Sequence, residues 1–129
     1  MSLFGKSRKK ILVVEDEPDI AEGLDARLGL ADYDVIIAPD GKSGVEKARA
    51  EKPDLVVLDI MLPKIDGFEV CRIIKSEAGT KHIPVLMLTS LSMMGDVERA
   101  FDVGANDYLS KPFTNERLLA KVKSLLKLE

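Results

Sequence analysis

The sequence predicts an α/β domain in which five strands alternate with five helices and the strands form a parallel sheet. Two apolar runs, Ile11–Val14 and Leu55–Leu58, have no polar–apolar alternation, which is typical of strands that are buried on both faces. After such runs, apolar residues recur at the spacing of amphipathic helices. Crossover helices of this length lie on both faces of a parallel sheet, so we expect a doubly wound (βα)5 fold.

Short apolar segments define the predicted strands. Most are bounded by charged residues, glycine or proline, which do not continue a buried strand. Pro84 is tolerable only near the start of its strand, because proline cannot donate a hydrogen bond to a neighbouring strand. The predicted strands are Ile11–Val14, Val35–Ile37, Leu55–Leu58, Ile83–Leu88 and Tyr108–Leu109.

Caps and apolar spacing define the predicted helices. Pro18 suits the first turn of a helix, because that turn leaves its amide hydrogens unused. Asp40, Asp66 and either Thr114 or Asn115 stand where N-caps are expected. The predicted apolar faces comprise Ile20, Leu24 and Leu28; Val45 and Ala48; Val70, Cys71 and Ile74; Val97, Ala100 and Phe101; and Leu118, Val122 and Leu125.

Composition limits the classes of function that are open to this chain. Its 129 residues suit one domain, with residues 1–9 as an N-terminal tail and residues 10–127 as the folded unit. The net charge is −3 and the one basic cluster, Lys6–Lys10, precedes the first strand, which disfavours nucleic-acid binding by this domain. A single cysteine excludes an internal disulfide framework. No apolar run could span a membrane and no secretion signal is visible, so we expect a cytoplasmic protein.

Polar side chains follow four of the predicted strands, each at the point where the strand ends. Glu15 and Asp16 follow the first strand, Asp59 the third, Thr89 the fourth and Lys111 the fifth. Parallel strands bring their carboxyl ends to one edge of a sheet, where open α/β sheets place their chemistry. Each residue alone has an ordinary explanation, such as a charge near a helix N-terminus, a cap or a surface lysine. Together they predict a functional site at this edge.

The residue types at this edge favour phosphoryl transfer. Three carboxylates in one place repel one another and therefore favour a bound cation, and an all-oxygen set suits Mg²⁺. With the cation on one side and Lys111 on the other, an anion could lie between them, and Thr89 adds a hydroxyl donor. Positioning and charge neutralisation provide most of the catalysis in phosphoryl transfer. A carboxylate can itself be the nucleophile and form an aspartyl phosphate, and Asp59 is the central candidate.

The chain resembles the CheY-like receiver domains of two-component response regulators from Lys10 to about Leu126. The motifs that carry the resemblance are VVEDE, LVVLDIMLPKIDG, LMLTS and DYLSKPF, which contain the candidate residues named above. The resemblance implies a flavodoxin-like sheet with the strand order 2-1-3-4-5. It also implies the set of Mg²⁺ ligands, which comprises Glu15, Asp16, Asp59 and the backbone carbonyl of Met61.

The same resemblance implies a signalling switch that catalyses only its own phosphorylation and dephosphorylation. A sensor histidine kinase or a histidine phosphotransfer protein would donate a phosphoryl group to Asp59, and Lys111 and Thr89 would bind the phosphoryl oxygens. Thr89 then shifts towards the phosphate and Tyr108 turns inward, which alters the face formed by the fourth helix, fifth strand and fifth helix. That face would act on a downstream target protein or effector domain, or form a phosphorylation-dependent homodimer. The Lys111–Pro112 peptide bond is typically cis in such domains.

Apolar residues flank the expected phosphorylation site. Met61 and Leu91 lie two residues beyond the aspartate and the threonine, where many relatives carry polar residues that can hold the attacking water. We therefore expect a long-lived phosphoryl group, although both side chains could simply pack on the rim of the site. Met93 and Met94 open the fourth helix near the expected output face, where thioethers suit either an adaptable partner surface or a cap on the core.

Three other functions are weaker alternatives. A haloacid-dehalogenase-type phosphatase uses similar residues but needs a second aspartate where Met61 stands. A flavodoxin-like cofactor binder needs a phosphate-binding loop where Glu15–Glu17 would repel phosphate. A receiver-shaped adaptor that binds partners without phosphorylation is disfavoured by the complete set of site residues. The sequence leaves open whether the receiver stands alone or belongs to a longer protein.

Overall fold

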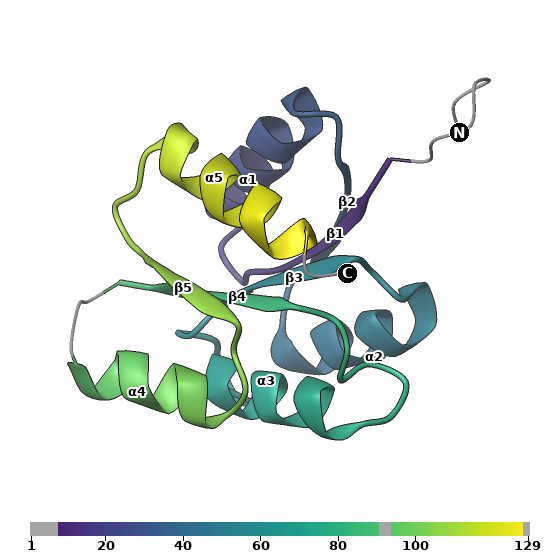
Figure 1. Cartoon of the computed structure of the whole chain (residues 1–129), viewed down its shortest axis with the longest axis vertical. Helices are drawn as coiled ribbons and strands as arrows, with labels where there is room; N and C mark the ends of the chain where they lie inside the picture. The colour runs from purple at the N-terminus through teal and green to yellow at the C-terminus, as the bar shows by residue number, and fades with distance from the viewer. Residues whose placement is uncertain (1–7, 91–93, 128–129) are drawn as a thin grey trace.

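The computed structural model describes residues 8–90 and 94–127, and these residues alternate between strands and helices as predicted (Figure 1). The described strands form one five-stranded parallel sheet in the order β2-β1-β3-β4-β5, which confirms the doubly wound, flavodoxin-like fold. In chain order the elements are β1 (Lys10–Val14), α1 (Pro18–Leu30), β2 (Asp34–Ala38), α2 (Gly41–Glu51), β3 (Leu55–Asp59), α3 (Gly67–Ser76), β4 (Val85–Thr89), α4 (Met94–Asp102), β5 (Asp107–Ser110) and α5 (Asn115–Leu126).

Helices cover both faces of the sheet. Helices α1 and α5 lie on one face, and α2, α3 and α4 lie on the other (Figure 1). Successive residues of β1 point to opposite faces: Ile11 and Val13 pack under α1 and α5, whereas Leu12 and Val14 pack under the other layer. All four are fully buried, as their continuous apolar run predicted. No helix among the described residues is both long and apolar enough to cross a membrane.

The structure distinguishes between the possible helix caps. At α2, Asp40 Oδ1 accepts a hydrogen bond of 2.7 Å from Ser43 N, and Asp40 N donates one of 3.4 Å to the Ser43 hydroxyl. At α5, Thr114 rather than Asn115 is the cap, because Thr114 Oγ1 accepts a hydrogen bond of 3.1 Å from Arg117 N. Both caps satisfy amide groups that the first helical turn leaves unpaired.

Two predicted details are wrong. Phe101 was expected on the buried face of its helix, but it is 47% exposed. Helix α4 packs beside β5 at the edge of the sheet, so that its turn presents Ala100 to the core and leaves Phe101 partly outside. The fourth strand begins at Val85 rather than Ile83, because Pro84 has no amide hydrogen to enter the ladder.

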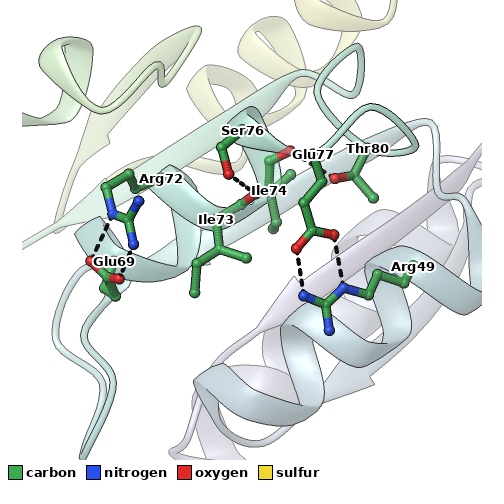
Figure 2. Close-up of polar contacts among 8 residues, drawn as sticks. All are labelled: Arg49, Glu69, Arg72, Ile73, Ile74, Ser76, Glu77 and Thr80. Carbon is green, nitrogen blue, oxygen red and sulfur yellow. Dashed lines mark hydrogen bonds and ion pairs between the residues drawn. The ribbon is translucent and has the colours of Figure 1, made fainter.

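Polar contacts join α2 to the C-terminal end of α3, away from the carboxyl edge of the sheet (Figure 2). Arg49 Nε and Nη2 donate hydrogen bonds of 2.8 and 2.5 Å to the two carboxylate oxygens of Glu77. Beyond the helix, the buried Thr80 hydroxyl donates a hydrogen bond of 2.7 Å to the Ile74 carbonyl, which the end of the helix leaves without an amide partner. The Arg49–Glu77 pair thus ties α2 to the end of α3, and the Thr80 hydroxyl closes the end of α3, without involving the predicted site.

Candidate functional site

The predicted site residues all lie at the carboxyl edge of the sheet. Asp59 and Thr89 are the last residues of β3 and β4, Glu15 and Asp16 follow β1, and Lys111 follows β5. Glu15, Asp59 and Thr89 are buried, Asp16 is exposed and Lys111 is half-buried. Residues spread over most of the sequence are therefore neighbours in the folded chain, with buried charges at the centre and exposed groups at the rim.

Lys111 is the cation of this group. Its Nζ donates a hydrogen bond of 2.8 Å to Asp59 Oδ2 and lies 3.7 Å from Glu15 Oε1. The other Asp59 oxygen, Oδ1, accepts a hydrogen bond of 2.9 Å from Met61 N. On the backbone, Lys111 N donates to the Thr89 carbonyl at 2.6 Å, which ties the ends of β4 and β5 together. Asp59 is therefore fixed by two donors, one of them charged.

The group holds more negative than positive charge. Oxygens of Glu15, Asp16 and Asp59 all lie within 4.8 Å of one another, and Lys111 alone is paired with them in the described part of the chain. Glu15 is 2% exposed, and its Oε1 has no hydrogen-bond partner among the described residues. Burial, followed by the neighbouring Asp59 carboxyl group, raises the pKa of Glu15 to about 8. A hard divalent cation would satisfy both the orphaned oxygen and the excess negative charge, so the residues fit Mg²⁺.

Gly67 allows α3 to begin close against Asp59. A Cβ atom at Gly67 would lie 2.3 Å from the Asp59 carbonyl oxygen and 2.7 Å from Ile60 Cα. The same residue donates a backbone hydrogen bond of 2.9 Å to the Ile60 carbonyl, while Asp66 caps the helix by accepting a hydrogen bond of 3.0 Å from Glu69 N. The sequence predicted only the helix cap at Asp66. The positioning of Asp59 by Gly67 was missed, because no local signal reveals this close tertiary approach.

The remaining predicted residues lie around this centre. Met61 is 69% exposed, and Tyr108 lies half-buried on β5. The Lys111–Pro112 peptide bond is cis. Leu91 and Met93 lie outside the described residues, and Met94 is the first residue of α4. The expected contacts of Leu91 and of the methionine pair therefore stay predictions.

Comparisons with known proteins agree with this geometry. The family model of the response regulator receiver domain matches residues 11–123. The DNA-binding dual master transcriptional regulator RpaA from Synechocystis sp. is 47% identical over 118 residues, which cover 92% of this chain and 49% of that protein. The chain spans about half the length of the curated relatives it matches.

Solved structures are also similar over most of the chain. A putative response regulator from Chloroflexus aurantiacus has a TM-score of 0.90 and 35% identity, over 94% of this chain and 99% of that one. The receiver domain of the sensor histidine kinase PA1611 from Pseudomonas aeruginosa, with a magnesium ion coordinated in its active site cleft, has a TM-score of 0.87 and 30% identity over the same shares. The sequence match, the fold and the carboxyl-edge cluster agree, and the chain belongs to the family of response regulator receiver domains.

Proposed function

We propose that this domain accepts a phosphoryl group on Asp59 from a phosphohistidine of a sensor histidine kinase or a histidine phosphotransfer protein. The observation that carries the proposal is the pairing of a buried aspartate with Lys111 at 2.8 Å, beside a cluster of two further carboxylates. Such an aspartate is a positioned nucleophile, and the ammonium group of Lys111 can bind the incoming phosphoryl oxygens.

In the transfer step, an Asp59 carboxylate oxygen forms a bond to phosphorus while the bond from phosphorus to the histidine nitrogen breaks. The electron pair of the broken bond stays on the imidazole nitrogen. Lys111 moves its hydrogen bond from the carboxylate to a phosphoryl oxygen, and the Thr89 hydroxyl donates to another. Dephosphorylation is the attack of water on phosphorus, which releases inorganic phosphate and restores the carboxylate. The domain thus catalyses only the reactions of its own aspartate.

We infer that Mg²⁺ is the cofactor of this reaction, held by Glu15, Asp16, Asp59 and the backbone carbonyl of Met61. When bound, the ion supplies charge neutralisation at the phosphoryl oxygens. The orphaned Oε1 of Glu15 and the excess of carboxylates support this assignment. The chain's own residues fix the nucleophile, through Met61 N on one oxygen and Lys111 on the other.

Phosphorylation would then act on partners through α4, β5 and α5. We propose that Thr89 and Tyr108 transmit the change, and that the output is a downstream protein, an effector domain or a homodimer. RpaA, which is named as a DNA-binding regulator, is about twice as long as this chain, so DNA binding would reside outside this domain. We further propose a folded unit at residues 10–127 behind an N-terminal tail at 1–9, in a cytoplasmic protein.

Intact mass after incubation with acetyl phosphate tests the proposal. A phosphoryl adduct that requires Mg²⁺ and is lost in Asp59→Asn would support it. If no adduct forms with or without Mg²⁺, the phosphorylation-independent adaptor would be the better description. Acetyl phosphate needs no docking surface, so the result does not depend on finding the natural kinase.

A further inference from the structure

Side chains from two helices contact the half-buried ring of Tyr108. Its ring packs edge-on against Phe101 of α4, with ring centroids 6.0 Å apart and an interplanar angle of 86°. From α5, the Lys121 ammonium lies 5.8 Å from the centre of the Tyr108 ring, within the range of a cation–π contact. Tyr108 belongs to the edge strand β5, where it also packs against the core beneath α2, α3 and α4.

Asp107 fixes this arrangement from the strand itself. One of its oxygens lies 2.9 Å from Lys121 Nζ, and the other accepts a hydrogen bond of 2.8 Å from Tyr108 N. The Asp107 and Lys121 side chains are only 27% and 34% exposed, so water screens their ion pair less than it screens a fully exposed one. The lysine is therefore held beside the tyrosine ring.

We propose that Phe101 and Lys121 are positioning residues that hold the Tyr108 ring in the position seen in this structure and thereby oppose the phosphorylation-dependent change. This inference rests on the proposed function, in which Tyr108 turns inward when Asp59 is phosphorylated. Turning the Tyr108 ring away from this position would break both ring contacts, and a contact made in one state alone shifts the equilibrium towards that state. The arrangement also accounts for the exposed Phe101, whose ring packs on Tyr108 instead of the core.

Binding of beryllofluoride to Asp59 in the presence of Mg²⁺ measures this equilibrium without a kinase. If the observed position of Tyr108 dominates in the free protein, removing either ring contact increases the fraction of protein that is competent to bind beryllofluoride. The half-saturating concentration of beryllofluoride then falls. We expect Phe101→Leu and Lys121→Gln each to lower it by about three- to tenfold, the range that one aromatic or cation–π contact allows. Phe101→Tyr keeps an aromatic edge and should behave as the parent chain. Lys123→Gln removes an exposed charge from the same helix and should change nothing.

The decisive comparison is made in a Tyr108→Ala background. There, Phe101→Leu and Lys121→Gln should leave the half-saturating concentration unchanged, because the ring that they hold is absent. A merely structural role would give the same effect with and without Tyr108. NMR supplies a second readout. Nuclear Overhauser effects, which report cross-relaxation between the ring protons of Phe101 and Tyr108, should be present in the free protein and lost when beryllofluoride binds.

Three results would overturn the inference: unchanged beryllofluoride binding in both variants, equal effects in the Tyr108→Ala background, or ring cross-relaxation that persists in the bound protein. These results differ from a failure of the proposed function. In that case the parent chain would neither bind beryllofluoride nor form a phosphoryl adduct at Asp59, and the inference would fall with it.

Discussion

Two groups of opposite charges in this chain have similar contact distances and different surroundings. On the outer surface of α2 and α3, Arg49 and Glu77 form a bidentate ion pair with hydrogen bonds of 2.8 and 2.5 Å (Figure 2). At the carboxyl edge, Lys111 lies 2.8 Å from Asp59, which is only 3% exposed and lies within a cluster of carboxylates. The surface pair is balanced in charge and screened by water, whereas the buried group needs further positive charge.

The comparison shows that burial, more than contact geometry, separates a structural ion pair from a reactive one. An exposed pair contributes about 0–1 kcal/mol to stability however well it is aligned. A buried carboxylate without a full set of partners costs stability, and a protein retains it where a ligand or a reaction supplies the missing partner. The predictions below test both halves of this contrast, from the largest expected effect to the smallest.

Gly67→Ala should disturb the buried group most. The new Cβ would lie 2.3 Å from the Asp59 carbonyl oxygen, so the loop or the start of α3 must move. We expect the free energy of unfolding in urea to fall by about 3 kcal/mol, with slower adduct formation from acetyl phosphate. Gly23→Ala is the matched control: nothing lies within 4 Å of its Cβ, and it should stabilise α1 by about 0.5–1 kcal/mol. Equal effects of the two substitutions on the free energy of unfolding would contradict the close approach of Gly67 to Asp59.

Glu15 should make the Mg²⁺-free protein less stable as pH rises. Its ordinary pKa is 4.5, and burial next to Asp59 raises the pKa to about 8 in the folded chain. Between these values the folded state binds more protons than the unfolded state, so the free energy of unfolding falls with increasing pH. We expect the free energy of unfolding to fall steadily across this range, and Mg²⁺ should reverse the loss.

Urea unfolding across that pH range checks the effect. Glu15→Gln should flatten the pH dependence, because the amide does not titrate, whereas Glu22→Gln on the exposed surface of α1 should leave it in place. A pH dependence that survives in Glu15→Gln would show that the buried group is not its source.

Polar residues at positions 61 and 91 should shorten the life of the phosphoryl group. We expect the paired change Met61→Asn and Leu91→Gln to accelerate adduct decay about tenfold, equivalent to about 1.4 kcal/mol in the barrier, by helping to hold the attacking water. The decay is followed by intact mass after removal of acetyl phosphate. An unchanged half-life would mean that the apolar side chains only pack on the rim.

The surface pair should show the smallest effect. Arg49→Gln and Glu77→Gln, combined in a double-mutant cycle, should give a coupling energy close to the measurement error of urea unfolding, because water screens the exposed pair. Neither substitution should alter adduct formation at Asp59. A coupling energy as large as the effect of Gly67→Ala would contradict the role assigned to solvent screening.

The central sheet and the predicted site could be read from the sequence because both depend on strand order along the chain. Continuous apolar runs marked the strands buried on both faces, and the residues directly after them had to meet at one edge. For the same reason, Glu15, Asp59 and Lys111 could be placed together despite their separation in sequence. The distances and hydrogen bonds between these three side chains could be known only from the tertiary structure.

Features that depend on how elements pack were not predictable. Phe101 has the spacing of a buried residue, but α4 lies at the sheet edge, and the packing partner of Phe101 is Tyr108 rather than the core. Gly67 carries no local signal of its approach to Asp59, because that approach is set by where α3 meets the loop. The choice between Thr114 and Asn115 as a cap likewise followed from backbone geometry that both residue types allow.

The most direct test of the account is to locate the phosphoryl group by chemical trapping. After incubation with acetyl phosphate and Mg²⁺, borohydride reduces an aspartyl phosphate to homoserine, and peptide mass spectrometry identifies the position. The account predicts homoserine at position 59 alone, absent without Mg²⁺ and absent in Asp59→Asn. Homoserine at another position, or none under conditions where the protein is folded, would contradict the claim that the buried carboxyl edge is the phosphorylation site.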